Sequence, residues 1–316
     1  MRTLKEPKEE QAPALMKVEC IVIPLLLSLL AGEVAAAGQS DEWVTESLQP
    51  VQITTASGVR ESDFLSVNND SSRARVFRWM VDDLGALGRS VFTPRVALYT
   101  AGAVGGTFAL AWLDDDLTKQ SKEIYTGEFR NFLEAVDYVG GPKINLPVVV
   151  LAGTSMLTNN IKFQDAAFTS LQTLLYAGVL GYLLKGIFGR ERPEWTNPDD
   201  PYAFFDRTGL NPLSHEGNSS YPSGHAIASF GIITPWVLYY PSAFTYALYI
   251  IPTGTAFSRL ATEKHWATDL VVGAVIGVAM GHWLTRRHQG IRSEQNRVSL
   301  SVIEDGKVFS LRVRLD

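Results

Sequence analysis

The stretch AIASFGIITPWVLYYPSAFTYALYIIPTGTAFS, residues 226–258, contains no charged side chain. It is far longer than an ordinary helix, and YYPSAF interrupts it near its middle, where the proline cannot continue a helical hydrogen-bond ladder. The stretch therefore predicts two helices joined by a turn. Glycine, alanine, serine and threonine are interspersed among its aliphatic residues, a composition typical of helices whose backbones pack closely together. We conclude that the fold is a bundle of apolar helices.

Further uncharged runs flank this stretch, and each predicts one helix: residues 96–113, 144–161, 166–184 and 270–285. The expected fold is thus all-α, with about six core helices. A membrane-spanning helix needs about 20 apolar residues to cross a hydrocarbon core of about 30 Å, and several of these runs are shorter. Because the runs lack the polar stripe of a soluble surface helix, they favour a membrane-embedded bundle over a soluble core.

The remaining segments define the domain organisation. Residues 1–37 read as a leader with a signal peptide, or an N-terminal anchor, because Lys17 precedes an apolar run that ends in an A-x-A cleavage site. Residues 38–95 are polar, with an amphipathic stretch at 76–92 that either lies along a membrane or packs on the bundle. The main domain covers 96–289. The tail, 290–316, alternates apolar and polar residues around Asp305-Gly306, which predicts a β-hairpin.

Charge and cysteine content exclude several classes. The net charge is −5 and the basic residues are scattered, so the basic patch of a nucleic-acid-binding protein is missing. The only cysteine, Cys20, lies in the predicted signal peptide. Signal cleavage would leave a mature protein without disulfides or a cysteine nucleophile.

Polar residues with chemical potential gather where apolar runs begin or end. Three clusters hold them: KGIFGRERP with Lys185 and Arg192, YPSGH with Ser223, Gly224 and His225, and SRLATEKHWATD with Arg259, His265 and Asp269. Taken singly, each has a structural explanation: interfacial anchors, a capped turn, or a solvent-facing histidine.

Taken together, the clusters point to a phosphate. His265 and Asp269 are four residues apart, so we expect them on one face of a helix, where the carboxylate accepts a ring N–H and leaves the other nitrogen free to attack. Three cations and a Ser-Gly turn suit a compact, strongly anionic partner. Phosphate fits best, held by arginine side chains and by the backbone N–H groups of Ser223 and Gly224.

These residues also carry a family resemblance. The pattern Lys185-x6-Arg192-Pro193, then Pro222-Ser223-Gly224-His225, then Ser258-Arg259-x5-His265-x3-Asp269 resembles the signature of the type 2 phosphatidic acid phosphatase (PAP2) superfamily. That superfamily includes bacterial acid phosphatases and vanadium-dependent haloperoxidases. The resemblance covers about residues 96–287.

The resemblance implies a role for each matching residue. His265 is implied to be the nucleophile, Asp269 to orient it, and His225 to protonate the leaving oxygen and later activate water. The phosphoryl oxygens would be held by Lys185, Arg192, Ser223, Gly224 and Arg259. No metal or other cofactor is implied, because these donors and cations supply the charge. The expected product is free phosphate, released through a phosphohistidine.

Three functions remain open at this point. The first is a membrane phosphatase acting on a phospholipid or a polyprenyl phosphate. The second is a soluble exported acid phosphatase, and the third is a haloperoxidase that binds vanadate in the same pocket. The residues that would select the substrate headgroup are expected in the segment 194–220, where His215 is read as a loop residue.

The predicted topology contains a conflict. Arginines cluster before the first run and after the last, at positions 73, 75, 78, 89, 95, 286, 287 and 292. They place both ends in the cytoplasm by the positive-inside rule, whereas a cleaved signal places residue 38 outside. We expect that the run 144–161 does not fully cross, and that the protein lies in a bacterial inner membrane with its site facing the periplasm. The alternative is a soluble periplasmic chain.

Overall fold

The computed structural model describes residues 75–91, 101–102, 105–195, 200–205, 219–302 and 309–313. Within them the main body is helical, as predicted. The predicted signal peptide, the residues up to 74 and His215 lie outside the described residues.

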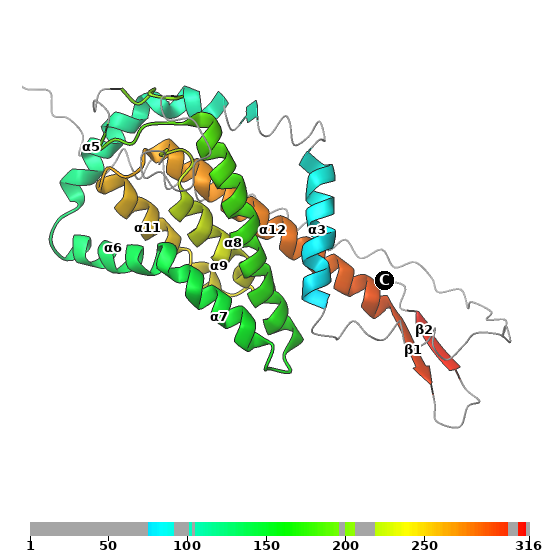
Figure 1. Cartoon of the computed structure of the whole chain (residues 1–316). Helices are drawn as coiled ribbons and strands as arrows, with labels where there is room; N and C mark the ends of the chain where they lie inside the picture. The colour runs from blue at the N-terminus through cyan, green and yellow to red at the C-terminus, as the bar shows by residue number, and fades with distance from the viewer. Residues whose placement is uncertain are drawn as a thin grey trace, which may run out of the picture. The chain divides into compact units, whose positions relative to one another are not determined.

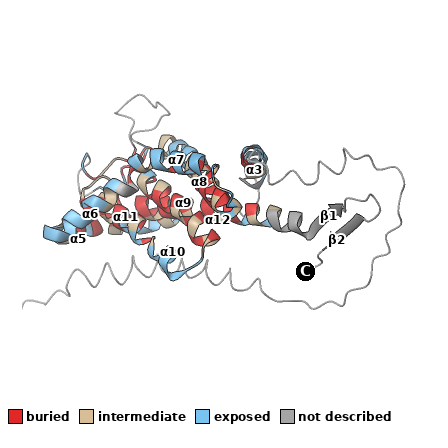
Figure 2. Cartoon of the chain, turned by 90° about the horizontal axis from the view of Figure 1, so that it is seen from below, coloured by how far each residue is buried: buried red, intermediate tan, exposed pale blue. Residues whose placement is uncertain are grey.

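Three helices form the centre of the bundle: α8 (Ile161–Phe188), α9 (Gly224–Tyr239) and α12 (Ala267–Arg297). Figure 1 shows α9 at the middle, in contact with α8, α11 and α12. In Figure 2, α9 is largely buried whereas α7 is largely exposed. The central position of α9 follows from its sequence, because it has no charged side chain to keep in water.

The uncharged stretch 226–258 forms two main helices, as predicted. The second is α11 (Ile250–Ala261), and the short α10 (Ala243–Ala247) occupies the turn between them. Pro241 follows the end of α9, and Ser242 caps α10 through a reciprocal hydrogen bond with Thr245.

The charged segment after residue 113 is also helical, which the search for uncharged runs did not predict. It forms α5 (Asp114–Ile124) and α6 (Gly127–Gly140), and the turn η2 (Ala111–Leu113) precedes them. Three aspartates open α5, where carboxylates stabilise the positive end of the helix dipole. α6 packs against α11 and α5 lies beside it, so this segment covers one side of the bundle.

The run 144–161 yields a shorter helix than predicted. The turn η3 (Pro142–Ile144) leads into α7 (Asn145–Ser155), which has 11 residues. At 1.5 Å per residue it is about 16 Å long, roughly half of a bilayer's hydrocarbon core. The chain then turns, and Asn160 caps α8 by accepting a hydrogen bond from the Phe163 N–H at 3.0 Å. Among the described residues, two helical segments are long and apolar enough to cross a membrane, namely Ile161–Phe188 and Ala267–Ile291.

Glycines bring α9 and α12 close together. A Cβ on Gly273 would lie 2.6 Å from the Ser223 carbonyl oxygen, and one on Gly277 would lie 2.5 Å from that of Ile227. One turn further along, Gly281 faces Thr234 in the same way. The two backbones therefore approach each other at a distance that only glycine permits.

The amphipathic stretch at 76–92 forms α3 (Arg75–Val91), which packs on the bundle. Its buried face contains polar and apolar residues: Arg75, Val76, Trp79 and Asp83. Buried Asp83 accepts hydrogen bonds from Gln172, Arg287 and His288, and the Trp79 ring stacks on His288. The arginines beside it in the sequence, Arg286 and Arg287, predict that His288 belongs to a cationic cluster at a membrane interface. That reading is wrong, because His288 is buried and bridges Asp83 and Thr169.

Two strands follow α12. β1 (Val298–Val302) pairs antiparallel with β2 (Phe309–Val313), with Leu300 opposite Leu311. The turn predicted at Asp305-Gly306 lies outside the described residues, so the hairpin as a whole stays a prediction.

Candidate active site

The three sequence clusters meet at one end of the bundle. Lys185 lies in the last turn of α8, which ends at Gly189 in the left-handed conformation with φ 48°. Ser223 caps the start of α9, Arg259 lies near the end of α11, and His265 lies two residues before the start of α12. Each apolar helix thus delivers its polar residues to the same rim.

His265 is buried, and its ring orientation is fixed by a backbone carbonyl. Its Nδ1 lies 2.8 Å from the carbonyl oxygen of Ser220, which can only accept, so Nδ1 carries the proton. The lone pair is then on Nε2. Burial is the main cause that lowers the pKa of His265, to about 4, so the ring is neutral near pH 7. A neutral imidazole with a free Nε2 is the form that can act as a nucleophile.

The relation between His265 and Asp269 differs from the expected one. α12 begins at Ala267, so the two residues do not share a helical face. The Asp269 Oδ2 atom lies 3.6 Å from His265 Nδ1, farther than the Ser220 carbonyl oxygen. Oδ2 instead accepts the Trp266 N–H at 2.9 Å, which fixes the backbone beside the histidine. Asp269 therefore holds the loop that carries His265, and its carboxylate also favours the protonated form of the His265 ring.

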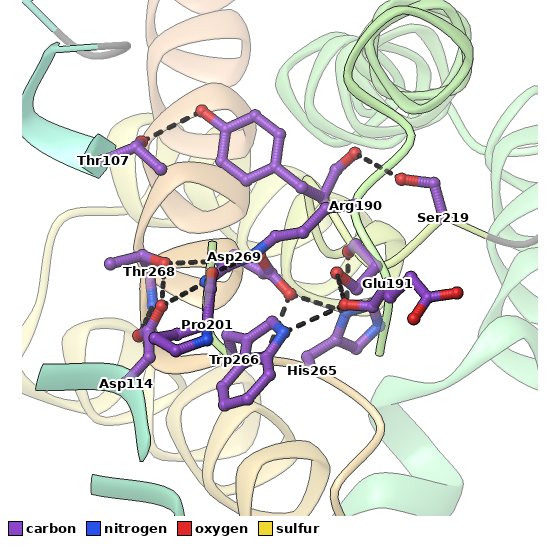
Figure 3. A network of polar contacts seen from close by, with 12 residues as sticks. Thr107, Asp114, Arg190, Glu191, Pro201, Ser219, His265, Trp266, Thr268 and Asp269 are labelled. Carbon is purple, nitrogen blue, oxygen red and sulfur yellow. Dashed lines mark hydrogen bonds and ion pairs between the residues drawn. The ribbon is translucent and has the colours of Figure 1, made fainter. Parts of the chain in front are cut away.

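Asp269 belongs to a buried network that the motif spacing did not reveal (Figure 3). The Arg190 guanidinium lies between two carboxylates, with Nη1 2.6 Å from Asp269 Oδ1 and Nη2 2.6 Å from Asp114 Oδ2. Asp114 in turn accepts the Thr268 N–H at 2.9 Å and the Thr268 hydroxyl at 2.6 Å. Arg190, Asp114 and Asp269 are fully buried. Burial raises the pKa of the Asp114 carboxyl above its usual range.

Lys185 supports the backbone next to the histidine. Its Nζ donates to the carbonyl oxygens of Ser219 and Ser220, the second of which also accepts from His265. Its ammonium therefore holds the segment that orients the imidazole, in addition to placing a positive charge in the site.

The Pro-Ser-Gly turn is used differently from the expected anion nest. The Ser223 N–H donates to the Asp269 carbonyl oxygen at 3.0 Å, and its hydroxyl accepts from the Ala226 N–H. The predicted use of the Ser223 N–H for phosphate is therefore wrong in this structure. Gly224 opens α9, and the N–H groups of Gly224 and His225 in its first turn have no partner within the helix, so they can bind an anion.

Arg192 and Arg259 line the same site with incompletely paired guanidinium groups. Arg192 lies 3.5 Å from Glu194 and 4.8 Å from the centre of the Trp195 ring, and Arg259 lies 3.4 Å from Asp137. Within the described part of the chain, the Nε atoms of both arginines are buried without a hydrogen-bond partner. Buried N–H groups without partners are costly, and a phosphate oxygen would satisfy them.

His225 lies in the first turn of α9, half-buried and close to Gly141, where a Cβ would lie 3.5 Å from its Nε2. Burial and the nearby positive charge of Arg259 lower the pKa of His225 to about 3. Two negative charges on a bound phosphate would oppose these causes, so the ring can gain a proton when the substrate arrives.

The site thus contains every residue that the sequence nominated, together with several that it did not. Arg190 and Thr268 lie at variable positions inside the motif stretches, whereas Asp114 lies far before the first motif in the sequence. The sequence gives no signal for Asp114 or for the Ser220 carbonyl. The segments 196–199 and 206–218, where we expected headgroup selection, lie outside the described residues.

The site combines a buried histidine that is neutral near pH 7, a second histidine, and two arginines whose Nε atoms have no hydrogen-bond partner among the described residues. Such a set of groups can bind a phosphate. Residues 166–293 match the family model described as PAP2 superfamily, which confirms the resemblance carried by the three motifs.

Several curated proteins and two solved structures are similar to parts of the chain. A lipid A 1-phosphatase of Porphyromonas gingivalis is 34% identical over 73 residues, which are 21% of this chain and 16% of that protein. A probable diacylglycerol pyrophosphate phosphatase of Schizosaccharomyces pombe is 25% identical over 48% of this chain and 63% of that protein. The chain therefore covers less than two thirds of either relative.

Both solved structures lie further from this chain. A transmembrane PAP2 type phosphatidylglycerolphosphate phosphatase from Bacillus subtilis aligns with a TM-score of 0.43 and 21% identity, over 69% of this chain and 96% of its own. The LpxE protein of Aquifex aeolicus aligns with a TM-score of 0.39 and 19% identity, over 55% of this chain and 95% of its own.

Proposed function

We propose that the protein is a phosphatase that removes a phosphate from a membrane lipid, a phosphomonoester or a pyrophosphate, through a phosphohistidine on His265. The observation that carries the proposal is the hydrogen bond from His265 Nδ1 to the Ser220 carbonyl. It leaves the Nε2 lone pair available in a site with two arginines whose Nε atoms are buried and have no hydrogen-bond partner among the described residues.

The reaction proceeds in two displacements. The Nε2 lone pair of His265 attacks phosphorus, the bond from phosphorus to the lipid oxygen breaks, and His225 gives that oxygen its proton. His225, now neutral, takes a proton from water as the water oxygen attacks the phosphohistidine, and phosphate leaves. The positive charges of Arg192 and Arg259 stabilise the phosphoryl oxygens in both steps, so the proposed mechanism requires no metal.

A lipid substrate is supported by two observations. α8 and α12, whose ends form the site, are the two helices apolar enough to cross a membrane among the described residues. The relatives named above act, by their names, on lipid A and on diacylglycerol pyrophosphate. Of the three functions left open by the sequence, the membrane lipid phosphatase is therefore the one we propose.

We further propose an inner-membrane location with the site facing the periplasm. The shortness of α7 supports this topology, because it removes one crossing from the six that conflicted with an exported N-terminus. Reporter fusions after Leu117 and after Gln289 test it. A cytoplasmic location of the loop between residues 185 and 225 would overturn it.

The activity is tested by phosphate release from a panel containing phosphatidate, phosphatidylglycerol phosphate, polyprenyl pyrophosphate and lipid A. His265→Ala is expected to abolish release, and His225→Ala to accumulate an acid-labile phosphoenzyme. His282→Ala, a histidine substitution further along α12, is the matched control and is expected to retain activity. Equal residual activity in the His265 and His225 variants would contradict the assigned roles. Bromide oxidation with vanadate and peroxide, without phosphate release from any lipid, would identify a haloperoxidase instead.

A further inference from the structure

We infer that Arg190 and Asp114 are positioning residues that act through Asp269 on the imidazole of His265. The inference rests on the proposed function only in naming His265 as the nucleophile. Neither residue is a fixed position of the three motifs, although Arg190 lies within the stretch KGIFGRERP. Both are fully buried in the network of Figure 3.

Arg190 holds both groups that face the His265 ring nitrogen. Its side chain donates to Asp269 Oδ1 at 2.6 Å, which leaves Oδ2 to accept the Trp266 N–H. Its backbone carbonyl accepts the Ser220 N–H at 2.8 Å, and the carbonyl of Ser220 accepts from His265. One residue therefore fixes the carboxylate and the carbonyl between which Nδ1 lies.

Asp114 anchors the opposite side of the arginine. Its two oxygens accept from Arg190 Nη2, from the Thr268 hydroxyl and from the Thr268 N–H. Asp114 thus ties α5 to the first turn of α12, the turn that carries Asp269. The Arg190 guanidinium is further enclosed by the rings of Phe204 and Trp266, at 4.6 and 5.2 Å from their centres.

The charge balance gives the two residues opposite effects on His265. One guanidinium lies between two carboxylates, so its positive charge is partly neutralised by Asp114. The rest of that charge weakens the attraction between Asp269 and an imidazolium at His265. Loss of the Arg190 charge would let Asp269 stabilise the imidazolium more strongly. Loss of the Asp114 charge would free Arg190 to neutralise Asp269 further.

The other charged groups around His265 stay unchanged in this comparison. They come from each element packed around the site: Lys185 on α8, Arg192 on the segment after it, His225 on α9, Arg259 on α11 and Asp137 on α6.

The test is the titration of His265 in the full-length protein with ¹³C-labelled histidine. The chain has five histidines, and the resonance lost in His265→Gln identifies the one of interest. Arg190→Gln is expected to raise the midpoint of His265 by about one pH unit or more, and Asp114→Asn is expected to lower it or leave it in place. Arg75→Gln, which breaks the buried Arg75–Asp165 ion pair between α3 and α8, is the matched control and should not move it.

Kinetics separate positioning from charge alone. Arg190→Lys keeps the charge but cannot bridge both carboxylates. In Arg190→Lys we therefore expect a titration midpoint of His265 close to that of wild type. We expect kcat to be about 10-fold or more below the wild-type kcat, at an almost unchanged KM. The acid limb of kcat/KM should follow the NMR midpoint in each variant.

Several results would overturn the inference. An unchanged His265 midpoint in Arg190→Gln, or shifts in the same direction for Arg190→Gln and Asp114→Asn, would reduce both residues to a purely structural role. Full kcat in Arg190→Lys would refute the positioning part. A wild-type protein that releases no phosphate from any lipid would refute the proposed function, whereas the NMR titration would still decide whether Arg190 and Asp114 control His265.

Discussion

Substitution of Gly273 by alanine tests whether the close packing of α9 on α12 builds the active site. The added Cβ would lie 2.6 Å from the Ser223 carbonyl oxygen and 3.0 Å from the Ala226 Cβ. An ordinary carbon–oxygen contact is about 3.3 Å or more, so the two backbones would have to separate locally by about 0.7 Å. Such overpacking costs about 1–3 kcal/mol.

The same shift would disturb the chemistry, because Ser223 is the residue whose N–H binds the Asp269 carbonyl oxygen. A displacement approaching 1 Å in a catalytic site lowers turnover by about 100-fold. We therefore expect Gly273→Ala to lower both the melting temperature, by about 2–10 °C, and kcat. Unfolding in detergent micelles, followed by tryptophan fluorescence, and phosphate release measure the two effects.

Gly178→Ala is the matched control. Gly178 lies within α8, and apart from the adjacent residues and the nearby backbone of its own helix, no described atom lies within 4 Å of the position its Cβ would take. Alanine is the better helix former by about 1 kcal/mol, so this variant should be as stable as wild type or more stable, with unchanged activity. If Gly273→Ala were indistinguishable from Gly178→Ala in melting temperature and turnover, the proposed contact between α9 and α12 would be refuted.

Three further predictions concern charged or titratable groups. Because burial lowers the pKa of His265 to about 4 from an ordinary value of 6.5, the unfolded chain binds the extra proton between these values. The contribution of neutral His265 to the free energy of unfolding should be complete above pH 6.5 and lost as the pH falls towards 4. Unfolding measured at a series of pH values tests this. The same pH dependence in His265→Gln as in wild type would contradict it. Lys185→Met should lower kcat by about 100-fold, because the Ser220 carbonyl that orients His265 loses the hydrogen bond from Lys185. Steady-state phosphate release measures this effect. An unchanged kcat would show that Lys185 does not support His265. Asp83→Asn should destabilise the docking of α3 by about 3 kcal/mol, because Arg287 and His288 lose a buried charged partner. Limited proteolysis should then cleave α3, while the phosphatase activity of the intact protein stays unchanged. Protease resistance equal to that of wild type would argue against this prediction.

The helical core was predictable because it depends on local composition. An uncharged stretch with a proline near its middle can bury itself only as two helices, and residues 226–258 form them. The charged segment that becomes α5 and α6 escaped the same reasoning, because its stability depends on packing against α11 and on the aspartates at the start of α5. The sequence also predicted too long a helix for α7, because the turn at 156–160 contains no proline or glycine that would indicate the end of a helix.

The meeting of the motif residues was predictable from their place at helix ends, but their contacts were not. The spacing of His265 and Asp269 suggested a shared helical face, whereas α12 begins between them and a carbonyl from a distant loop takes the ring N–H. His288 shows the same limit, because its neighbours in the sequence are arginines while its partners are Asp83 and Thr169.

The contrast between these two histidines has a physical reason. A histidine's role depends on the acceptor that faces each ring nitrogen, and acceptors arrive from segments far away in the chain. Both ring nitrogens of His288 are hydrogen-bonded, Nδ1 with the Thr169 hydroxyl and Nε2 with the Asp83 carboxylate, so neither nitrogen is available to a ligand. Among the described residues, the acceptors near His265 lie at Nδ1: the Ser220 carbonyl at 2.8 Å and, farther away, the Asp269 carboxylate, which Arg190 holds. Because only Nδ1 of His265 is hydrogen-bonded in this way, Nε2 is available to a phosphate in the proposed reaction. In the role we infer for them, Arg190 and Asp114 hold in place the groups that bind Nδ1.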